Sequence, residues 1–196
     1  MRDVYIAGAG LTPAGEHWER SLRELAFYAI EAVAKDAPQP NPEALFVGNM
    51  LGGALSHQAH LGALVADFAG LRGIEAVSVE AAGASGGAAL RQAYLAVASG
   101  SVDTALVVGV EKMTDKVGAG VIAATATAGD SDYESAHGTT PAALAALLMR
   151  RYMHTHGVEL KHFANFSVNA HLNAKANPNA MFRNTLTVEA FLKAGM

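Results

Sequence analysis

The sequence predicts an α/β fold, in which a mostly parallel sheet is wrapped by helices. Short β-branched runs alternate with helix-length segments through residues 2–113, as strands and crossover helices alternate in parallel sheets. After residue 116 no further strand-like run follows, and the remaining segments have helical patterns. A chain of 196 residues is also long enough to bury a core. We therefore divide the chain into an α/β domain, residues 1–116, and a partial helical domain, residues 117–196.

The predicted strands are short segments rich in Val, Ile and Leu, which favour a pleated and buried environment. They span residues 2–9, 44–47, 76–79 and 103–110. We expect the first of these strands at the centre of the sheet and the third at one edge. Ligands of open α/β sheets bind beyond the carboxyl ends of the strands, so the residues that follow each strand are the first candidates for a site.

The predicted helices have apolar residues at helical spacing. Residues 21–35 are the clearest example, because Ser21 and Glu24 have the spacing of a capping box. A second helix is expected at residues 56–69, and a third ends at Ser99 before Gly100. The last segment should contain three more helices, at residues 139–154, 158–174 and 187–193.

The composition excludes several classes of protein. Apolar residues make up 51% of the chain but are dispersed, so no membrane-spanning segment is predicted. The 14 Lys and Arg residues are scattered and the net charge is −4, which argues against nucleic-acid binding. Cysteine is absent, which excludes disulfides, thiolate metal sites and thiol catalysis. The N-terminus lacks the pattern of a secretory signal, and we expect a soluble cytoplasmic protein.

The corner at residues 80–87, EAAGASGG, joins the third strand to its helix and carries the most chemical information. The first residues of such a helix meet unpaired backbone N–H groups and the positive end of the helix dipole. This environment acidifies a thiol and stabilises a neighbouring oxyanion. The corner therefore suits nucleophilic chemistry, yet the position where the nucleophile is expected is Gly83.

The same corner fits the G-x-S-x-G spacing of a serine-hydrolase elbow, with Ser85 as its nucleophile. A catalytic acid and a histidine should then follow in the chain. The later histidines stand at no predicted strand end; they are His137, His154, His156, His162 and His171. The alternative, which we favour, is that Ser85 is a small residue that lets the helix pack closely on the strand.

Two further motifs are explained better without a ligand. Gly8 and Gly10 resemble part of a dinucleotide-binding turn, but Pro13 stands where its helix should begin, so a plain tight turn is favoured. His57 and His60 can share one helical face, but no carboxylate completes a metal site in the sequence. Solvated or interface histidines are favoured there, and no metal site is predicted.

The residues after the fourth predicted strand form another candidate site. Glu111, Lys112 and Met113 stand at its carboxyl end, where ligands of α/β sheets bind. Met113 offers an adaptable apolar wall for a substrate. An isolated ion pair between Glu111 and Lys112 is the alternative interpretation.

Six segments, taken in chain order, resemble the first half of a thiolase. They are VYIAGAGLTPAGEH, SLRELAFYAIEAVAKDA, ALFVGNMLGG, VEAAGASGGAALRQAYLAVASG, ALVVGVEKMTD and NAHLNAKANPNAMFRN. The resemblance covers essentially the whole chain, and the fourth and fifth segments are its most specific parts. The most similar branch contains archaeal acetyl-CoA acetyltransferases and sterol-carrier-protein-type thiolases.

This resemblance implies a thiolase-type αβα layered fold with two similar halves, of which this chain contains the first. It also implies a helical loop domain inserted in that half and a tight dimer. The implied substrate is an acyl-CoA, processed by Claisen chemistry through a cysteine acyl-enzyme, with no cofactor beyond the coenzyme A thioester. The family's partner histidine, second cysteine and asparagine–water oxyanion hole belong to its later half.

The same resemblance assigns roles to particular residues. The family's nucleophilic cysteine falls on Gly83, which has no side chain to acylate, although its backbone N–H can still serve an oxyanion hole. Ala136, His137 and Gly138 fall near the place where the loop domain of the family meets the pantetheine arm of coenzyme A. Together with Met113, these are the predicted substrate-binding residues.

The leading hypothesis is therefore a component of a thiolase-like acyl-CoA acyltransferase, of the acetyl-CoA acetyltransferase type. It would act as a homodimer or in a hetero-oligomer with a chain that supplies the later half, without nucleic-acid or membrane partners. Gly83 argues against an acyl-enzyme on this chain alone. The alternatives are a fragment of a longer protein, a degenerate homologue that binds acyl-CoA without transfer, a retro-aldolase component, or a structural subunit.

Overall fold

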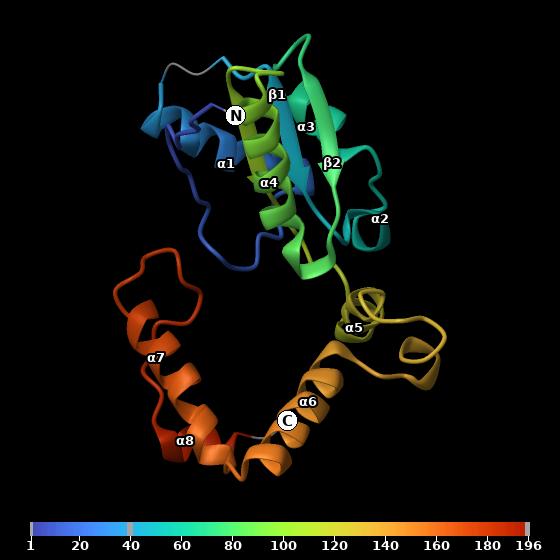
Figure 1. The fold of residues 1–196 in the computed structure, drawn as a ribbon, viewed down its shortest axis with the longest axis vertical. Coiled ribbons are helices and arrows are strands. Elements are labelled where there is room, and N and C mark those ends of the chain that lie inside the picture. The colour runs from blue at the N-terminus through green and yellow to red at the C-terminus, as the bar shows by residue number, and fades with distance from the viewer. Residues whose placement is uncertain (1, 39–40, 195–196) are drawn as a thin grey trace. The chain divides into compact units, whose positions relative to one another are not determined.

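The computed structural model describes residues 2–38 and 41–194. The chain divides into two compact units, each described by itself (Figure 1). The first unit contains Met1–Thr12 and His17–Ala128, and the second contains Pro13–Glu16 and Gly129–Met196. The domain boundary after residue 116 stays a prediction.

A parallel sheet of three strands forms the centre of the first unit. Strand β1 (Ala44–Gly48) lies between β2 (Glu75–Val79) and β3 (Ala105–Gly109) and is parallel to both. All five residues of β1 are buried, because strands flank both of its edges and helices cover both of its faces. The structure thus confirms the parallel α/β fold, and β2, the third predicted strand, does lie at an edge.

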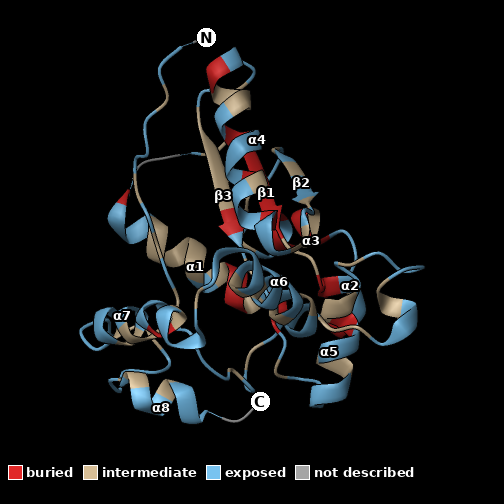
Figure 2. Cartoon of the chain, turned by 60° about the horizontal axis from the view of Figure 1, so that its bottom comes forward, coloured by how far each residue is buried: buried red, intermediate tan, exposed pale blue. Residues whose placement is uncertain are grey.

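Helices cover the two faces of this sheet. Helices α1 (Leu22–Asp36) and α3 (Leu61–Phe68) pack on one face and contact each other. Helix α4 (Ser85–Ser99) packs on the opposite face, against β1 and β3. The unit therefore has three layers in the order αβα, with the buried residues concentrated on β1 and the helix faces turned toward it (Figure 2).

The alternation of side chains along β1 supplies both layers of the core. Leu45 and Val47 point to the α1 and α3 side, whereas Ala44 and Phe46 point to α4, as the two-residue period of a strand requires. Leu45 and Val47 are fully buried. A buried aliphatic side chain of this kind contributes about 1.5–3 kcal/mol relative to an exposed one.

The capping box predicted at the start of α1 is present. The Ser21 Oγ accepts a hydrogen bond from the backbone N–H of Glu24, and the Glu24 carboxylate accepts one from the backbone N–H of Ser21. The Ser21 hydroxyl also donates to the Glu24 carboxylate at 2.7 Å. The hydrogen bonds from the Ser21 backbone N–H and from the Ser21 hydroxyl, the first being the larger cause, hold the pKa of the Glu24 carboxyl below its usual value.

This cap gives a pH-dependent prediction. Because the folded-state pKa of Glu24 is lowered, its stabilisation is present above the ordinary glutamate pKa and is lost as the pH falls through the folded-state value. Glu24→Gln should remove this part of the pH dependence of the unfolding free energy, measured by denaturant titration between neutral and acidic pH. Glu31→Gln in the middle of the same helix is the matched control. An equal pH slope in both variants would contradict the prediction.

The strand predicted at residues 2–9 is wrong, and so is its central position. In the described chain its only backbone–backbone hydrogen bond runs from the Arg2 N–H to the Ala98 carbonyl, at 3.1 Å. Tyr5 and Ile6 are 83% and 81% exposed. The β-branched pattern favours an extended strand, but a strand also needs a neighbour for its backbone groups. Among the described residues, β3 pairs only with β1.

The helix predicted at residues 56–69 is shorter than expected. A separate short helix, α2 (Gly52–Leu55), comes first, and α3 begins only at Leu61. His57 and His60 have φ angles of 52° and 57°, in the left-handed region that ends a right-handed helix. Spacing alone does not reveal this interruption.

Helix α5 (Gly118–Ala126) was not predicted from its Ala/Gly/Thr-rich sequence. Gly is a poor helix former, so the propensity of the segment is weak. Ala124 is buried and clusters with Leu51 and Leu55 near α2. Tertiary packing in the first unit therefore stabilises a helix that its composition does not favour.

The second unit consists of helices in the part of it that the structure describes. The predicted helices are confirmed as α6 (Pro141–His156), α7 (Ala164–Ala174) and α8 (Val188–Lys193), with a 3-10 turn before α7. The Thr140 Oγ1 caps α6 by accepting a hydrogen bond from the Ala143 N–H at 3.1 Å. No helix among the described residues has both the length and the apolar character that a membrane crossing needs.

Candidate functional site

The glycine-rich corner follows β2 directly, at the carboxyl edge of the sheet. A 3-10 turn, Ala82–Ala84, leads into α4. Gly83 lies in this turn and is exposed. Its φ angle is outside the left-handed region, and a Cβ added there would meet no atom within 4 Å. Position 83 can therefore hold an L-residue with a side chain. The resemblance to thiolases implies this, because it places the family's nucleophilic cysteine at position 83.

The backbone N–H of Gly83 has no hydrogen-bond partner among the described residues, whereas the neighbouring Ala84 N–H donates to the Ala81 carbonyl at 2.9 Å. Gly83 also stands at the N-terminal end of the 15-residue helix α4. Free N–H groups and the helix dipole favour a negatively charged oxygen at such a place. The corner can thus donate a hydrogen bond to a carbonyl oxygen or an oxyanion.

Ser85 is not available as a hydrolase nucleophile. Its side-chain Oγ accepts a hydrogen bond from the Ala81 N–H at 3.0 Å and donates one to the Ala82 carbonyl at 2.7 Å. The residue is only 5% exposed. A serine nucleophile needs a histidine base at its hydroxyl, but this hydroxyl is bonded to the backbone. The structural interpretation of Ser85 is therefore the correct one.

Asn49, which the sequence analysis did not select, and Glu111, which it did, hold the carboxyl edge of the sheet together. The Asn49 backbone N–H donates to the Val79 carbonyl of β2 at 3.1 Å, and its side-chain amide donates to the Val110 carbonyl after β3 at 2.8 Å. The Glu111 carboxylate accepts from the Asn49 side chain at 2.9 Å and from the N–H groups of Met50 and Leu51 at 3.0 Å. Asn49 and Glu111 thus connect the ends of all three strands. The only feature of the sequence that could have indicated a role for Asn49 is that it is a polar residue close after a buried strand.

The ion pair considered between Glu111 and Lys112 is not formed. Lys112 is buried and pairs with Asp115, while Glu111 binds the loop after β1. Met113 is 43% exposed at the same edge of the sheet, where an apolar ligand could contact it. Nearby, the Lys116 Nζ lies 3.3 Å from the His57 Nε2.

The other predicted substrate-binding residues belong to the second unit. His137 ends a 3-10 turn, Ser135–His137, and Gly138 follows with a left-handed φ of 73°. Ala136, His137 and Gly138 are all exposed. Gly83 and Met113 lie in the first unit, so the pairing of these two groups of residues stays a prediction.

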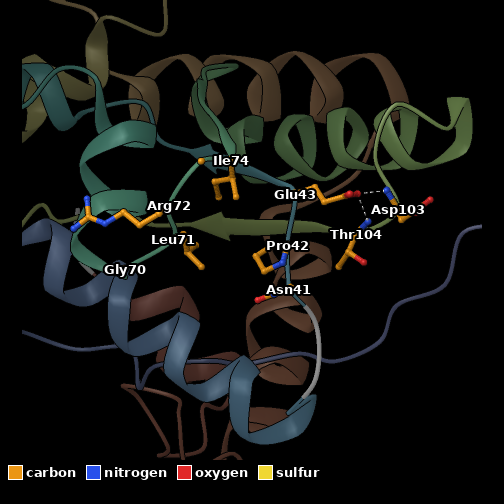
Figure 3. A pocket seen from close by; sticks show the side chains of 10 residues that line it. Asn41, Pro42, Glu43, Gly70, Leu71, Arg72, Ile74, Asp103 and Thr104 are labelled. Atoms are coloured by element: carbon orange, nitrogen blue, oxygen red, sulfur yellow. Dashed lines mark hydrogen bonds between the residues drawn. The ribbon is translucent and has the colours of Figure 1, made fainter.

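A pocket of about 890 Å³ lies at the opposite edge of the sheet (Figure 3). Its walls are the segments before the three strands: residues 41–43, 70–74 and 103–104. The Glu43 carboxylate is used there for structure, because it accepts hydrogen bonds from the N–H groups of Asp103 and Thr104. Since parallel sheets bind ligands at their carboxyl edge, this pocket is separate from the candidate site.

Residues 4–190 match the family model described as thiolase, N-terminal domain. This chain belongs to the thiolase family. The match includes β1, β2, β3 and the corner at Gly83. That this corner is the nucleophile turn of the family stays a prediction.

Curated relatives of this thiolase domain agree with the assignment. An acetyl-CoA acetyltransferase of Methanocaldococcus jannaschii is 43% identical over 99% of this chain and 50% of its own length. The acetyl-CoA acetyltransferase of Methanothermobacter thermautotrophicus is 41% identical over 100% and 51%. Benzoylsuccinyl-CoA thiolase subunit BbsB of Thauera aromatica is 33% identical over 96% and 48%. The chain spans about half the length of these relatives.

The fold is also similar to a solved structure. The structure described as Ltp2-ChsH2(DUF35) aldolase superposes with a TM-score of 0.71 at 26% identity. The match covers 97% of this chain and 48% of that chain. This thiolase domain therefore matches about half of each of these proteins.

Proposed function

We propose that this chain is the N-terminal half of a thiolase-like acyl-CoA enzyme of the acetyl-CoA acetyltransferase type, in which the Gly83 N–H binds the thioester carbonyl oxygen. The open corner at Gly83 carries this proposal. Its N–H is unpaired among the described residues, and it stands at the N-terminus of α4 in a thiolase domain. A donor aimed at the oxygen where negative charge develops is a strong source of transition-state stabilisation.

No acyl-enzyme forms at position 83, because glycine carries no thiol. The corner can polarise a thioester carbonyl, and we propose that the later half of the fold supplies the groups for proton transfer and the nucleophile. The substrate-binding residues we propose are Met113 in the first unit and Ala136, His137 and Gly138 in the second, all exposed. The proposed ligand is a coenzyme A thioester, with no other cofactor.

We further propose that the chain works with a polypeptide that supplies the later half of the thiolase fold. The curated relatives are about twice as long as the matched region, which supports such a completion. The second unit also exposes large apolar side chains suited to a protein contact: Leu147, Leu148 and Phe166 are 63%, 72% and 77% exposed.

A homodimer is the second assembly we propose. Edge strand β2 has no neighbour on its outer side in the described chain, and every one of its residues is at least partly exposed. Leu90 and Tyr94 of α4 are 52% and 48% exposed. Unpaired strand edges with exposed apolar residues favour pairing with another chain.

The location we propose is the cytoplasm, and the process is acyl-CoA and lipid metabolism. We propose no nucleic-acid or membrane partner.

A retro-aldolase component is the second candidate function. The absent nucleophile at Gly83 favours it, because retro-aldol cleavage of an acyl-CoA does not need an acyl-enzyme. The structure with a TM-score of 0.71 is itself described as an aldolase. A structural subunit without ligand binding is the third candidate.

Calorimetric titration with acetyl-CoA tests ligand binding directly. The chain should be purified together with whatever polypeptide accompanies it in its source. We expect saturable heat from acetyl-CoA, and a weaker response from a coenzyme A analogue that lacks the thioester carbonyl. The absence of heat with a folded protein would exclude both acyl-CoA functions and favour the structural subunit. Release of an aldehyde or ketone from a β-hydroxyacyl-CoA would distinguish the aldolase from the acyltransferase.

A further inference from the structure

The corner before α4 contains an alanine in a conformation that alanine rarely adopts. Ala82 has a φ angle of 47°, in the left-handed region. This conformation is unfavourable for a residue with a Cβ, because the Cβ comes too close to the following carbonyl oxygen. It persists only where the surrounding structure holds it in place.

Two side chains hold Ala82 from both sides. The Glu80 carboxylate accepts a hydrogen bond from the Ala82 N–H. The Ser85 Oγ donates to the Ala82 carbonyl at 2.7 Å, and that carbonyl also accepts the Ser85 backbone N–H. Both polar groups of the Ala82 backbone are therefore occupied. Ser85 is buried, whereas Glu80 is exposed.

These bonds determine the direction of the Gly83 N–H. The Ala82 carbonyl and the Gly83 N–H belong to one planar trans peptide, in which the C=O and N–H bonds point in opposite directions. Since Ser85 holds the carbonyl toward the start of α4, the N–H on the other side of the same peptide points away from that contact. The Gly83 N–H is unpaired among the described residues, and space is open around its Cα.

We propose that Glu80 and Ser85 are positioning residues, which fix the Ala82–Gly83 peptide so that the Gly83 N–H is presented to an incoming oxygen. They act through the backbone and need not touch the ligand. The inference goes beyond the proposed function, because it concerns how the donor is held whatever ligand the corner binds. A preorganised donor needs no reorientation when charge develops on the ligand, which makes it more effective.

A reporter thiol tests this inference without any acyl-CoA. Gly83→Cys places a thiol where the added Cβ meets no atom within 4 Å, in a chain that has no other cysteine. The pH dependence of its alkylation by iodoacetamide gives the thiol pKa. Oriented N–H groups at a helix N-terminus should hold this pKa below the free value of about 8.5.

Glu80→Gln and Glu80→Ala are each combined with Gly83→Cys. Comparing the two variants separates the effect of the hydrogen bond to the Ala82 N–H on the thiol pKa from the effect of the Glu80 charge. Both changes remove the negative charge, but only the glutamine keeps an oxygen that can accept from the Ala82 N–H. We expect the thiol pKa to be about one unit higher with alanine than with glutamine, which is about a tenfold loss of thiolate at a pH below both values. Because Glu80 is exposed, both proteins should fold.

Ser85→Ala in the same background should also raise the thiol pKa. The matched control is Ser99→Ala at the other end of α4, where the Ser99 Oγ donates to the Ala96 carbonyl at 3.0 Å. Circular dichroism establishes that each variant is folded, and if Ser85→Ala unfolds, the Glu80 pair alone decides. Equal thiol pKa values for the two Glu80 variants, or no change in a folded Ser85→Ala protein, overturn the inference. A failure to bind acetyl-CoA would instead concern only the proposed function.

Discussion

Gly83→Cys, combined with a polypeptide that supplies the later half of the fold, is expected to become acylated by acetyl-CoA. The thiolate would attack the thioester carbonyl, the bond to the coenzyme A sulfur would break, and free coenzyme A would leave. The corner is prepared for this step, because position 83 is open, does not need a left-handed backbone and stands at the N-terminus of α4. Intact-mass spectrometry should show the mass of one added acetyl group, where the Gly83 protein shows none.

Gly87→Cys is the matched control for this experiment. Gly87 is also exposed, and its added Cβ would meet no atom within 4 Å, but it lies one turn further along α4. A thiol there lies within α4 and outside the 3-10 turn that contains Gly83, away from the proposed site, so its acylation should be much slower. Equal labelling of both cysteines, or no adduct on Cys at position 83 of a folded and reconstituted protein, would contradict a thiolase-type corner.

Gly48→Ala is expected to destabilise the first unit and displace the corner. The added Cβ would lie 2.6 Å from the Ser85 carbonyl oxygen and 2.8 Å from the Gly86 Cα. These are backbone atoms that cannot rotate away, so the end of β1 and the start of α4 would have to separate. Overpacking of this kind costs about 1–3 kcal/mol, which should appear as a lower denaturant midpoint and as changed amide chemical shifts around Gly83.

Gly53→Ala provides the control for Gly48→Ala. A Cβ at Gly53 would meet no atom within 4 Å, and the residue lies in the short helix α2. Alanine is a better helix former than glycine, so this variant should be as stable as the original chain or slightly more stable. If Gly48→Ala leaves both the midpoint and the Gly83 shifts unchanged, the close approach between β1 and α4 does not hold the corner.

The strands and helices that could be predicted are those whose local pattern agrees with their environment. The buried segment at β1 is apolar throughout and lies between two strands and two helical layers. Helix α1 begins at a capping box that two residues reveal in the sequence. Residues 2–9 have an equally good strand pattern, but they have no partner strand in the described chain, where β3 pairs only with β1. A strand depends on a partner that local sequence does not contain.

Some features of the candidate site could likewise be predicted from the sequence, and others could not. Its place after β2, the absence of a thiol at Gly83 and the N-terminus of α4 follow from residue order, because a strand, a glycine-rich turn and a helix are local features. The sequence offered two interpretations of Ser85, and the hydrogen bonds to Ala81 and Ala82 decide between them. Asn49 and Glu111 are 62 residues apart and meet only because β1 and β3 are neighbours.

The sequence by itself determined the α/β class, the family, the position of the corner and the absence of a thiol at residue 83. These depend on residue identity and on periodicities that span a few turns of chain. Only the tertiary structure decided that residues 2–9 join no strand in the described chain, that Ala82 is left-handed between Glu80 and Ser85, and that the Gly83 N–H is free among the described residues. Such features depend on which backbone groups find partners across the fold, and pairing of this kind is a property of the assembled chain.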